Sequence, residues 1–116
     1  MHEMSLMGDI IQLVQEDAEA KGMKRLEKIE LLVGEIANAM PDALRMAFAI
    51  IHEQNPQLFS ETAELVIHLE EAKAECVLCG HVYRPEQKIA LCPQCNIPSG
   101  RMLSGETFQV LSYEGE

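Results

Sequence analysis

Four cysteines form the most distinctive chemical pattern in the sequence. They stand as two pairs, Cys76-Val-Leu-Cys79 and Cys92-Pro-Gln-Cys95, with twelve residues between the pairs. Two residues between cysteines let both thiolates reach one ion from a single tight turn, and Gly80 supplies the backbone freedom that such a turn needs. Four sulfurs at the corners of a tetrahedron suit Zn²⁺ and leave no open position for a catalytic water. We therefore expect a structural zinc site.

Other interpretations of this cysteine pattern stay open at this point. Tetrahedral sulfur also suits iron, as in a rubredoxin-like electron carrier, and a zinc ribbon can serve as an interaction module for proteins or nucleic acids. Disulfides are disfavoured, because the sequence shows no secretory signal and no apolar run of about 20 residues, so we expect a cytoplasmic protein. His81 is either a surface histidine beside a metal loop or a modulator of the metal site.

The first three residues, Met1-His2-Glu3, offer a second arrangement with metal chemistry. The α-amine, the His2 backbone nitrogen and the His2 imidazole can bind one metal in fused chelate rings, and the Glu3 amide or carboxylate can complete the set. A planar, nitrogen-rich array selects Ni²⁺ or Cu²⁺ rather than zinc. The competing interpretation is a solvated histidine without a metal. We interpret His52 and His68 as structural.

Charge separates the cysteine segment from its flanks. The chain has 9 Lys and Arg against 19 Asp and Glu, a net charge of −10, which argues against nucleic acid and anionic membranes as partners. Residues 1–71 carry a net charge of −9, residues 72–105 carry +2, and residues 106–116 carry −3. Four thiolates with Zn²⁺ sum to −2, so the metal site would balance the basic excess of its own segment.

Hydrophobic periodicity predicts the elements that position these residues. Residues 4–21 have apolar side chains at helical spacing and end at Gly22, and Pro41 opens a second helix that Asn55-Pro56 breaks. Residues 26–33, 64–71 and 107–113 alternate as strands with one buried face, the middle one carrying Leu65, Ile67 and Leu69 on that face.

We therefore predict an α+β fold in which two helices cover one face of a small three-stranded sheet. The helical crossover between the first two strands permits a parallel pair, which would make the sheet mixed. A four-cysteine zinc-ribbon or rubredoxin-like insert precedes the last strand. The expected organisation is one domain of residues 1–72 and 104–116 and a zinc-binding domain of residues 73–103. The sequence has no phosphate-binding loop, nucleophile elbow or paired-carboxylate motif, so we do not expect an enzyme.

Taken together, these features resemble the HypA/HybF family of hydrogenase nickel-incorporation proteins. The resemblance spans essentially the whole chain, and the combination of the double Cys-x-x-Cys with an initial Met-His-Glu is its most specific part. The matching motifs are Met1-His2-Glu3, Val33-Gly34-Glu35, Pro41, Leu44, Ala47-Phe48, Cys76-Val-Leu-Cys79-Gly80-His81, Cys92-Pro-Gln-Cys95, and the strand from Gly105 to Ser112 and Glu114.

The resemblance implies a nickel metallochaperone. It implies Ni²⁺ as cargo at the Met1 amine, at the His2 amide and imidazole and at Glu3, with structural Zn²⁺ at the four cysteines. The implied partners are a nickel-maturation GTPase and the large subunit of nickel-iron hydrogenase, with urease maturation proteins as further partners of some members, and the chain would be a monomer or a homodimer. Any further nickel ligand is not evident, because Met40 and Pro41 supply no side-chain anion.

Overall fold

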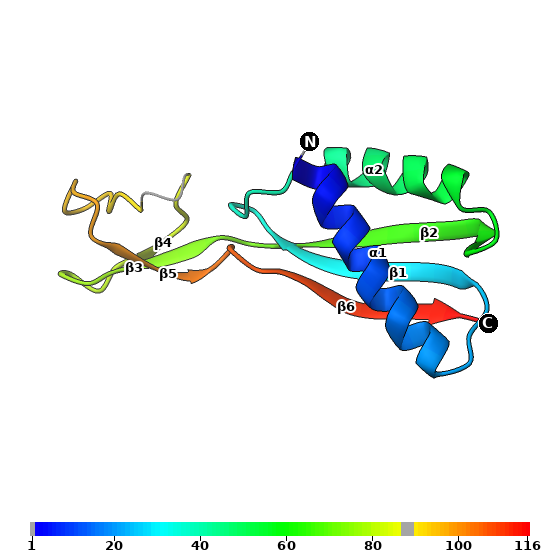
Figure 1. Ribbon diagram of the computed structural model, residues 1–116. Helices are drawn as coiled ribbons and strands as arrows, with labels where there is room; N and C mark the ends of the chain where they lie inside the picture. Colours follow the sequence, from blue (N-terminus) through cyan, green and yellow to red (C-terminus); the bar gives the residue numbers. More distant parts are fainter. Residues whose placement is uncertain (1, 87–89) are drawn as a thin grey trace. The chain divides into compact units, whose positions relative to one another are not determined.

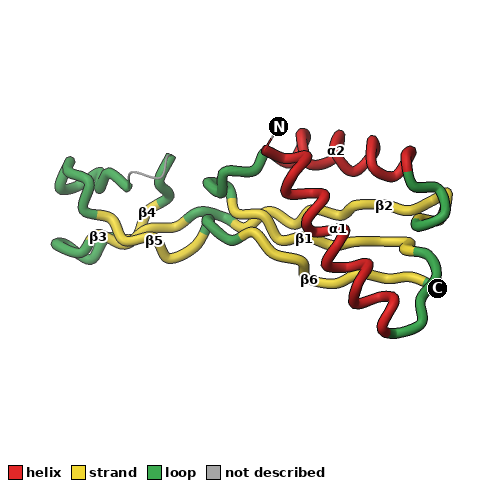
Figure 2. The backbone as a smooth tube through the Cα atoms, viewed as in Figure 1, coloured by secondary structure: helices red, strands yellow, loops and turns green. Residues whose placement is uncertain are grey.

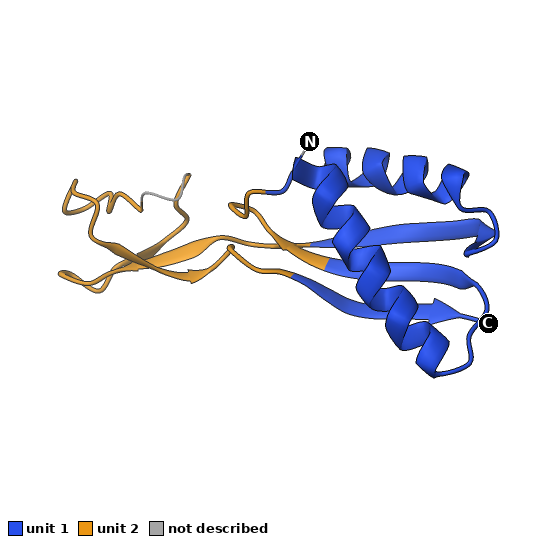
Figure 3. Cartoon of the chain, in the orientation of Figure 1, with its two compact units in different colours: residues 1–31, 39–68, 109–116 blue, residues 32–38, 69–108 orange. Residues whose placement is uncertain are grey.

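The computed structural model describes residues 2–86 and 90–116, which form two compact units (Figure 3). Unit 1 comprises the residues up to Leu31 together with Ala39–His68 and Gln109–Glu116, and unit 2 comprises Leu32–Asn38 and Leu69–Phe108. Both cysteine pairs lie in unit 2, whereas the first helix lies in unit 1. Within the described residues, no helix is long and apolar enough to cross a membrane.

Helix α1 (His2–Ala20) confirms the first predicted helix and begins two residues earlier than predicted. The turn that follows it contains Gly22, whose φ of 78° lies in the left-handed region that glycine adopts without strain. The Met23 amide donates to the Ala18 carbonyl (2.9 Å) and the Gly22 amide to the Glu19 carbonyl (3.0 Å). This pair of bonds satisfies carbonyls that the last helical turn would otherwise leave without partners.

The central sheet has the strand order β2-β1-β6. Its strands are β1 (Leu26–Gly34), β2 (Phe59–Glu70) and β6 (Phe108–Gly115). The Leu26 amide donates to the Leu58 carbonyl (2.8 Å) at the start of β1, and the Glu35 amide donates to the Glu70 carbonyl (2.9 Å) just past its end. The N-terminal ends of the two strands therefore lie side by side, and so do their C-terminal ends. This means that β1 and β2 run parallel.

Strand β6 pairs with β1 in the opposite direction. The Gly34 amide donates to the Thr107 carbonyl (2.7 Å) where β1 ends and β6 begins, and the Glu116 amide donates to the Arg25 carbonyl (2.9 Å) at the other end of the pair. The sheet is therefore mixed, as the helical crossover between the first two strands indicated. Figure 1 shows the helix that connects the end of β1 to the start of β2.

Helix α2 (Pro41–Gln54) begins at the proline that the sequence indicated, because a proline in the first turn costs no intrahelical hydrogen bond. It ends before Asn55, whose side-chain amide donates to the Ile51 carbonyl (2.8 Å). Helix α2 packs against α1, and both helices cover the same face of the sheet (Figure 1). This arrangement confirms the predicted two-layer fold.

The core of unit 1 is mainly aliphatic and lies between the helices and the sheet. Its buried side chains are Met7, Ile10, Ile11, Val14, Ala18, Leu26, Ile29, Leu31, Ala39, Leu44, Ala47, Phe48 and Phe59. Strand β2 begins at Phe59 rather than at residue 64, because the polar residues between these positions hide the alternation. The placement of Leu69 on the buried face was wrong: its side chain is 61% exposed, since it belongs to unit 2 and lies outside this core.

Unit 2 contains a second sheet that the sequence did not predict, with the order β4-β3-β5 (Figure 2). Its strands are β3 (Lys73–Cys76), β4 (Val82–Tyr83) and β5 (Gly100–Ser104). Both pairs are antiparallel, and Arg101 on β5 donates to the carboxylate of its partner Glu75 on β3 (2.7 Å). Strands of two to five residues are too short to show a period-two pattern.

Small residues pack tightly where the chain passes into and out of the second sheet. A Cβ atom on Gly34 would overlap the backbone of Gly105, and one on Gly105 would meet Ala72. Gly105 also has a φ of 108°, which disfavours any other residue. The Glu70 carboxylate accepts hydrogen bonds from the Gly105 amide (2.7 Å) and from the Thr107 hydroxyl (3.1 Å). Side-chain volume at these glycines is therefore incompatible with the observed backbone.

We expect Gly34→Ala to lower the free energy of unfolding by about 1–3 kcal/mol, the usual cost of overpacking. Denaturant unfolding of the metal-loaded protein measures this change. Gly8→Ala is the matched control, because Gly8 is exposed within α1 and a Cβ there meets no atom within 4 Å. That control should gain about 0.5–1 kcal/mol. Equal stability of the two variants would contradict the packing argument.

Candidate metal centre

The four cysteine sulfurs lie together, all within 4.8 Å of one another. The Sγ atoms of Cys76 and Cys95 are 3.7 Å apart, as are those of Cys79 and Cys92. A tetrahedral ion with metal–sulfur bonds of about 2.3 Å places its ligands about 3.8 Å apart, whereas a disulfide needs about 2.05 Å. The spacing therefore fits one metal ion and not a pair of disulfides. It is the one such cluster of potential metal ligands among the described residues.

Two equivalent turns present the sulfurs. The Gly80 amide donates to the Cys76 carbonyl (2.9 Å), and the Asn96 amide donates to the Cys92 carbonyl (2.7 Å). Gly80 has a φ of 77° and Asn96 a φ of 60°, so each turn closes through a left-handed residue just after its second cysteine. The role of Gly80 was predicted, but that of Asn96 was missed. The signal was present, since asparagine is the residue after glycine that best tolerates this conformation.

Backbone amides point at the first sulfur of each pair. The amides of Leu78 and Cys79 each lie 3.4 Å from the Cys76 sulfur, and the Cys95 amide lies 3.4 Å from the Cys92 sulfur. Both Cys76 and Cys92 are buried, whereas Cys79 is exposed. Hydrogen bonds to a thiolate favour its charged form, so these turns are suited to holding ionised cysteines around a cation.

The Ser99 hydroxyl lies 3.0 Å from the Cys76 sulfur. This contact, followed by the Cys79 amide, holds the pKa of Cys76 well below its usual range. The neighbouring thiols, first Cys79 and then Cys76, raise the pKa of Cys95. Four thiols so close together cannot all ionise unaided, so the fully ionised cluster requires a cation to offset the repulsion. Neither residue type nor spacing singled out Ser99 in the sequence.

His81 lies beside the first cysteine turn but outside the sulfur cluster. Its carbonyl accepts a hydrogen bond from the Cys76 amide (2.9 Å), and its ring stacks on Tyr83 with centroids 5.9 Å apart. The Tyr83 hydroxyl in turn donates to the Ala90 carbonyl (2.7 Å). The structure thus gives His81 a structural backbone contact, and its role as a modulator of the metal site stays a prediction.

The expected nickel ligands lie at the start of α1, except for Met1, which is outside the described residues. His2 is exposed, and the Glu3 carboxylate accepts a hydrogen bond from the Met40 amide (3.4 Å). Amides in the first turn of a helix have no acceptor within the helix. The backbone nitrogens of His2 and Glu3 can therefore serve a metal without breaking a helical hydrogen bond.

The two other candidate histidines have protein partners. The His52 ring nitrogen lies 2.9 Å from the Ser60 carbonyl, and the His68 ring nitrogen lies 3.0 Å from the Glu30 carboxylate. The Ser112 hydroxyl donates to the second oxygen of the same carboxylate (2.7 Å). Both contacts agree with the structural roles that we expected for these side chains.

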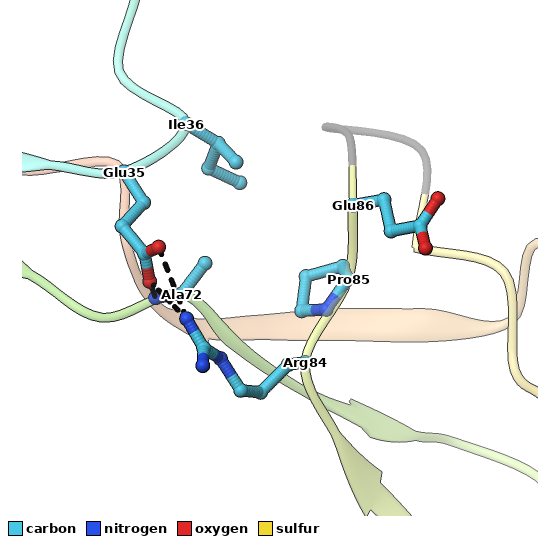
Figure 4. Close-up of a pocket in the computed structure, with 6 residues that line it drawn as sticks. All are labelled: Glu35, Ile36, Ala72, Arg84, Pro85 and Glu86. Carbon is cyan, nitrogen blue, oxygen red and sulfur yellow. Dashed lines mark hydrogen bonds and ion pairs between the residues drawn. The ribbon is translucent and has the colours of Figure 1, made fainter.

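A groove in unit 2 contains an ion pair that sequence reasoning did not single out (Figure 4). Arg84 donates to both carboxylate oxygens of Glu35 (2.9 and 3.0 Å), and the Ala72 amide donates to the same carboxylate (2.7 Å). Arg84 also lies 3.3 Å from the Glu71 carboxylate. The lining residues are Glu35, Ile36, Ala72, Arg84, Pro85 and Glu86. Since Arg84 and Glu35 are paired with each other, we interpret the groove as a structural contact that holds two segments of unit 2 together.

Comparison with known proteins gives matches along the whole chain. The family model for hydrogenase/urease nickel incorporation, the metallochaperone HypA, matches residues 1–115. The hydrogenase maturation factor HypA of Chlorobium luteolum is 34% identical over 120 residues, covering 100% of each chain. That of Moorella thermoacetica is 28% identical over 116 residues, again covering 100% of each chain.

Two solved structures have the same fold. One is described as the solution structure of HypA protein, with a TM-score of 0.66, 26% identity, and coverage of 100% of this chain and 97% of that one. The other is the solution structure of the Ni metallochaperone HypA from Helicobacter pylori, with a TM-score of 0.63, 25% identity, and coverage of 97% and 96%.

We expect Cys92→Ser to abolish metal binding at the cluster and to unfold its surroundings, because Cys92 is a fully buried member. Hydrogen–deuterium exchange should show that backbone amides of strands β3, β4 and β5 lose their protection, whereas those of α1 keep it. Treating the unaltered protein with a chelator should give the same pattern. Full protection of unit 2 after both treatments would show that no metal supports its fold.

Acid should weaken the contribution of Glu35 to stability. The Ala72 amide, and after it Arg84, hold the pKa of Glu35 below its ordinary value of 4.5. The contribution is therefore complete above pH 4.5 and is lost as the pH falls through the lower pKa of the folded protein. Urea unfolding should show Glu35→Gln less stable than the unaltered chain at pH 7, with a difference that shrinks towards pH 3. The exposed Glu64→Gln is the control, and a difference independent of pH would contradict this account.

Proposed function

Because the chain belongs to the HypA family of nickel-incorporation metallochaperones, we propose that it binds Ni²⁺ at its N-terminus and delivers it during hydrogenase maturation. Delivery proceeds with a partner GTPase to the large subunit of nickel-iron hydrogenase, and urease maturation proteins are a second class of recipient. The observation that carries the proposal is the whole-chain family match together with the Met-His-Glu start. The chain carries metal as cargo and needs no catalytic group.

The proposed nickel ligands are the Met1 amine, the His2 amide and imidazole, and Glu3. Two features of the described residues support this set. His2 is exposed, and the first-turn amides have no helical acceptors. A square-planar nickel site needs ionised amides, and the positive end of a helix favours negative charge. The start of α1 therefore favours the anionic form of these ligands.

Selectivity and release follow from different properties of this terminal site. Selectivity comes from the planar nitrogen geometry, which Ni²⁺ accepts and Zn²⁺ does not favour. Release is easy because the ligands belong to a chain terminus and not to a buried cage. Binding displaces protons from the amine, the amide and the imidazole, so affinity falls as the pH falls.

Zn²⁺ is the metal that we propose for the four cysteines. The sulfur spacing fits a tetrahedral ion, and the net charge of +2 on residues 72–105 balances the −2 of a zinc tetrathiolate. Zinc at this site would supply folding free energy to unit 2, whose sheet is made of short strands. Iron in the same site would give an electron carrier, and a coloured protein would distinguish that case.

The test is metal analysis and nickel titration of untagged protein that begins at Met1. We expect one bound zinc ion and one added Ni²⁺. Changes to residues that only orient a metal ligand cost roughly 10- to 100-fold in affinity, so His2→Ala, which removes a direct ligand, should cost at least as much. Affinity should also weaken as the pH is lowered.

The matched control is His68→Gln, because His68 lies on β2 and contacts Glu30. This variant should bind nickel as tightly as the unaltered chain, and both variants should retain zinc. Equal nickel affinity of His2→Ala and the unaltered chain would refute the terminal site. A chain that contains iron in place of zinc would refute only the assignment of the cysteine site.

A further inference from the structure

We propose that Ser99 is a positioning residue of the four-cysteine metal centre: its hydroxyl holds the Cys76 sulfur and sets how firmly that sulfur keeps its metal. The inference rests on the proposed metal centre and deepens it. The direct observation is the 3.0 Å separation between the Ser99 Oγ and the Cys76 Sγ. A metal-bound cysteine is a thiolate with no proton to give, so the serine hydroxyl must be the donor.

Backbone contacts hold Ser99 in place between the two cysteine turns. Its amide donates to the Ile97 carbonyl (2.8 Å), just after the second turn, and its carbonyl accepts from the Val77 amide (2.9 Å), inside the first turn. The serine is therefore fixed to both halves of the site before its side chain is considered. Its position is specified by the same turns that position the sulfurs.

Among the described residues, the serine hydroxyl has one other acceptor within reach, the Ile97 carbonyl at 3.4 Å. That contact is longer than the one to Cys76 and has a neutral acceptor, whereas a hydrogen bond to an ionised acceptor is about twice as strong. The hydroxyl will therefore donate to the sulfur whenever Cys76 is a thiolate. Cys76 itself is 1% exposed, so little water competes for this bond.

The contact makes the four sulfurs unequal. Cys76 has three donors around it, namely the Leu78 and Cys79 amides and the Ser99 hydroxyl. Cys92 is as deeply buried, yet within the described residues its sulfur accepts from one amide, that of Cys95. Each donor withdraws electron density from a thiolate and fixes its direction, as partners of metal ligands do in general. Cys76 is thus more firmly oriented than Cys92, the other fully buried ligand.

The test uses protein loaded with ¹¹³Cd²⁺, a spectroscopic substitute for Zn²⁺. In the unaltered chain we expect a coupling between the cadmium nucleus and the Ser99 hydroxyl proton, transmitted through the sulfur. Ser99→Ala should lose the coupling and shift the cadmium resonance. Competition with a chelator should show that this variant binds the metal roughly 10- to 100-fold more weakly than the unaltered chain. Ser99→Thr keeps a hydroxyl and should restore all three properties.

The matched control is Ser104→Ala, because Ser104 lies on β5 and its hydroxyl donates to the Glu71 carbonyl (2.7 Å) away from the sulfurs. It should leave the cadmium resonance and the metal affinity unchanged. Absence of the coupling in the unaltered chain, or equal resonance and affinity in Ser99→Ala, overturns the role of Ser99. Failure of the unaltered chain to bind Zn²⁺ or Cd²⁺ instead overturns the metal centre itself.

Discussion

Repulsion among four closely spaced sulfur atoms is the constraint on which unit 2 depends. The sulfurs approach to 3.7 Å in two pairs, a distance too long for disulfides and suited to a shared cation. The segments that present them are two tight turns joined to strands of two to five residues. Such strands bury little apolar surface, so the metal that we propose would take the place of the hydrophobic core that a larger domain uses.

Unit 1 is stabilised by a different force. Its core is a layer of aliphatic side chains between two helices and one face of a mixed sheet. This layer has a strong periodic signature, and both helices and the strands at residues 26–33 and 107–113 could be predicted from sequence alone. Strand β2 was predicted too short, because its first residues alternate poorly and Phe59 stands apart from the later apolar positions.

The parts that sequence reasoning missed depend on contacts between residues far apart in the chain. The spacing of the cysteines predicted the sulfur cluster, because a Cys-x-x-Cys pair is a local device. Ser99 and Arg84 were not predicted, since each acts on a residue more than twenty positions away, Cys76 in one case and Glu35 in the other. Leu69 was wrongly placed on the buried face, because an alternating pattern does not show at which residue a strand stops being covered by the helices. Local periodicity specifies elements, and only the folded chain specifies which elements meet.

The contact between Glu3 and the Met40 amide links the start of one helix to the start of the other. Met40 is the N-cap residue of α2, and it makes no capping bond with its own side chain. The Glu3 carboxylate, which belongs to α1, therefore supplies a polar contact to this end of α2, at 3.4 Å from the Met40 amide nitrogen. The lone pair that meets the amide cannot also bind a cation, so a metal that drew this oxygen away would leave the end of α2 less well capped. If the terminus holds nickel through Glu3 as we propose, fraying of the first turn of α2 would accompany nickel binding.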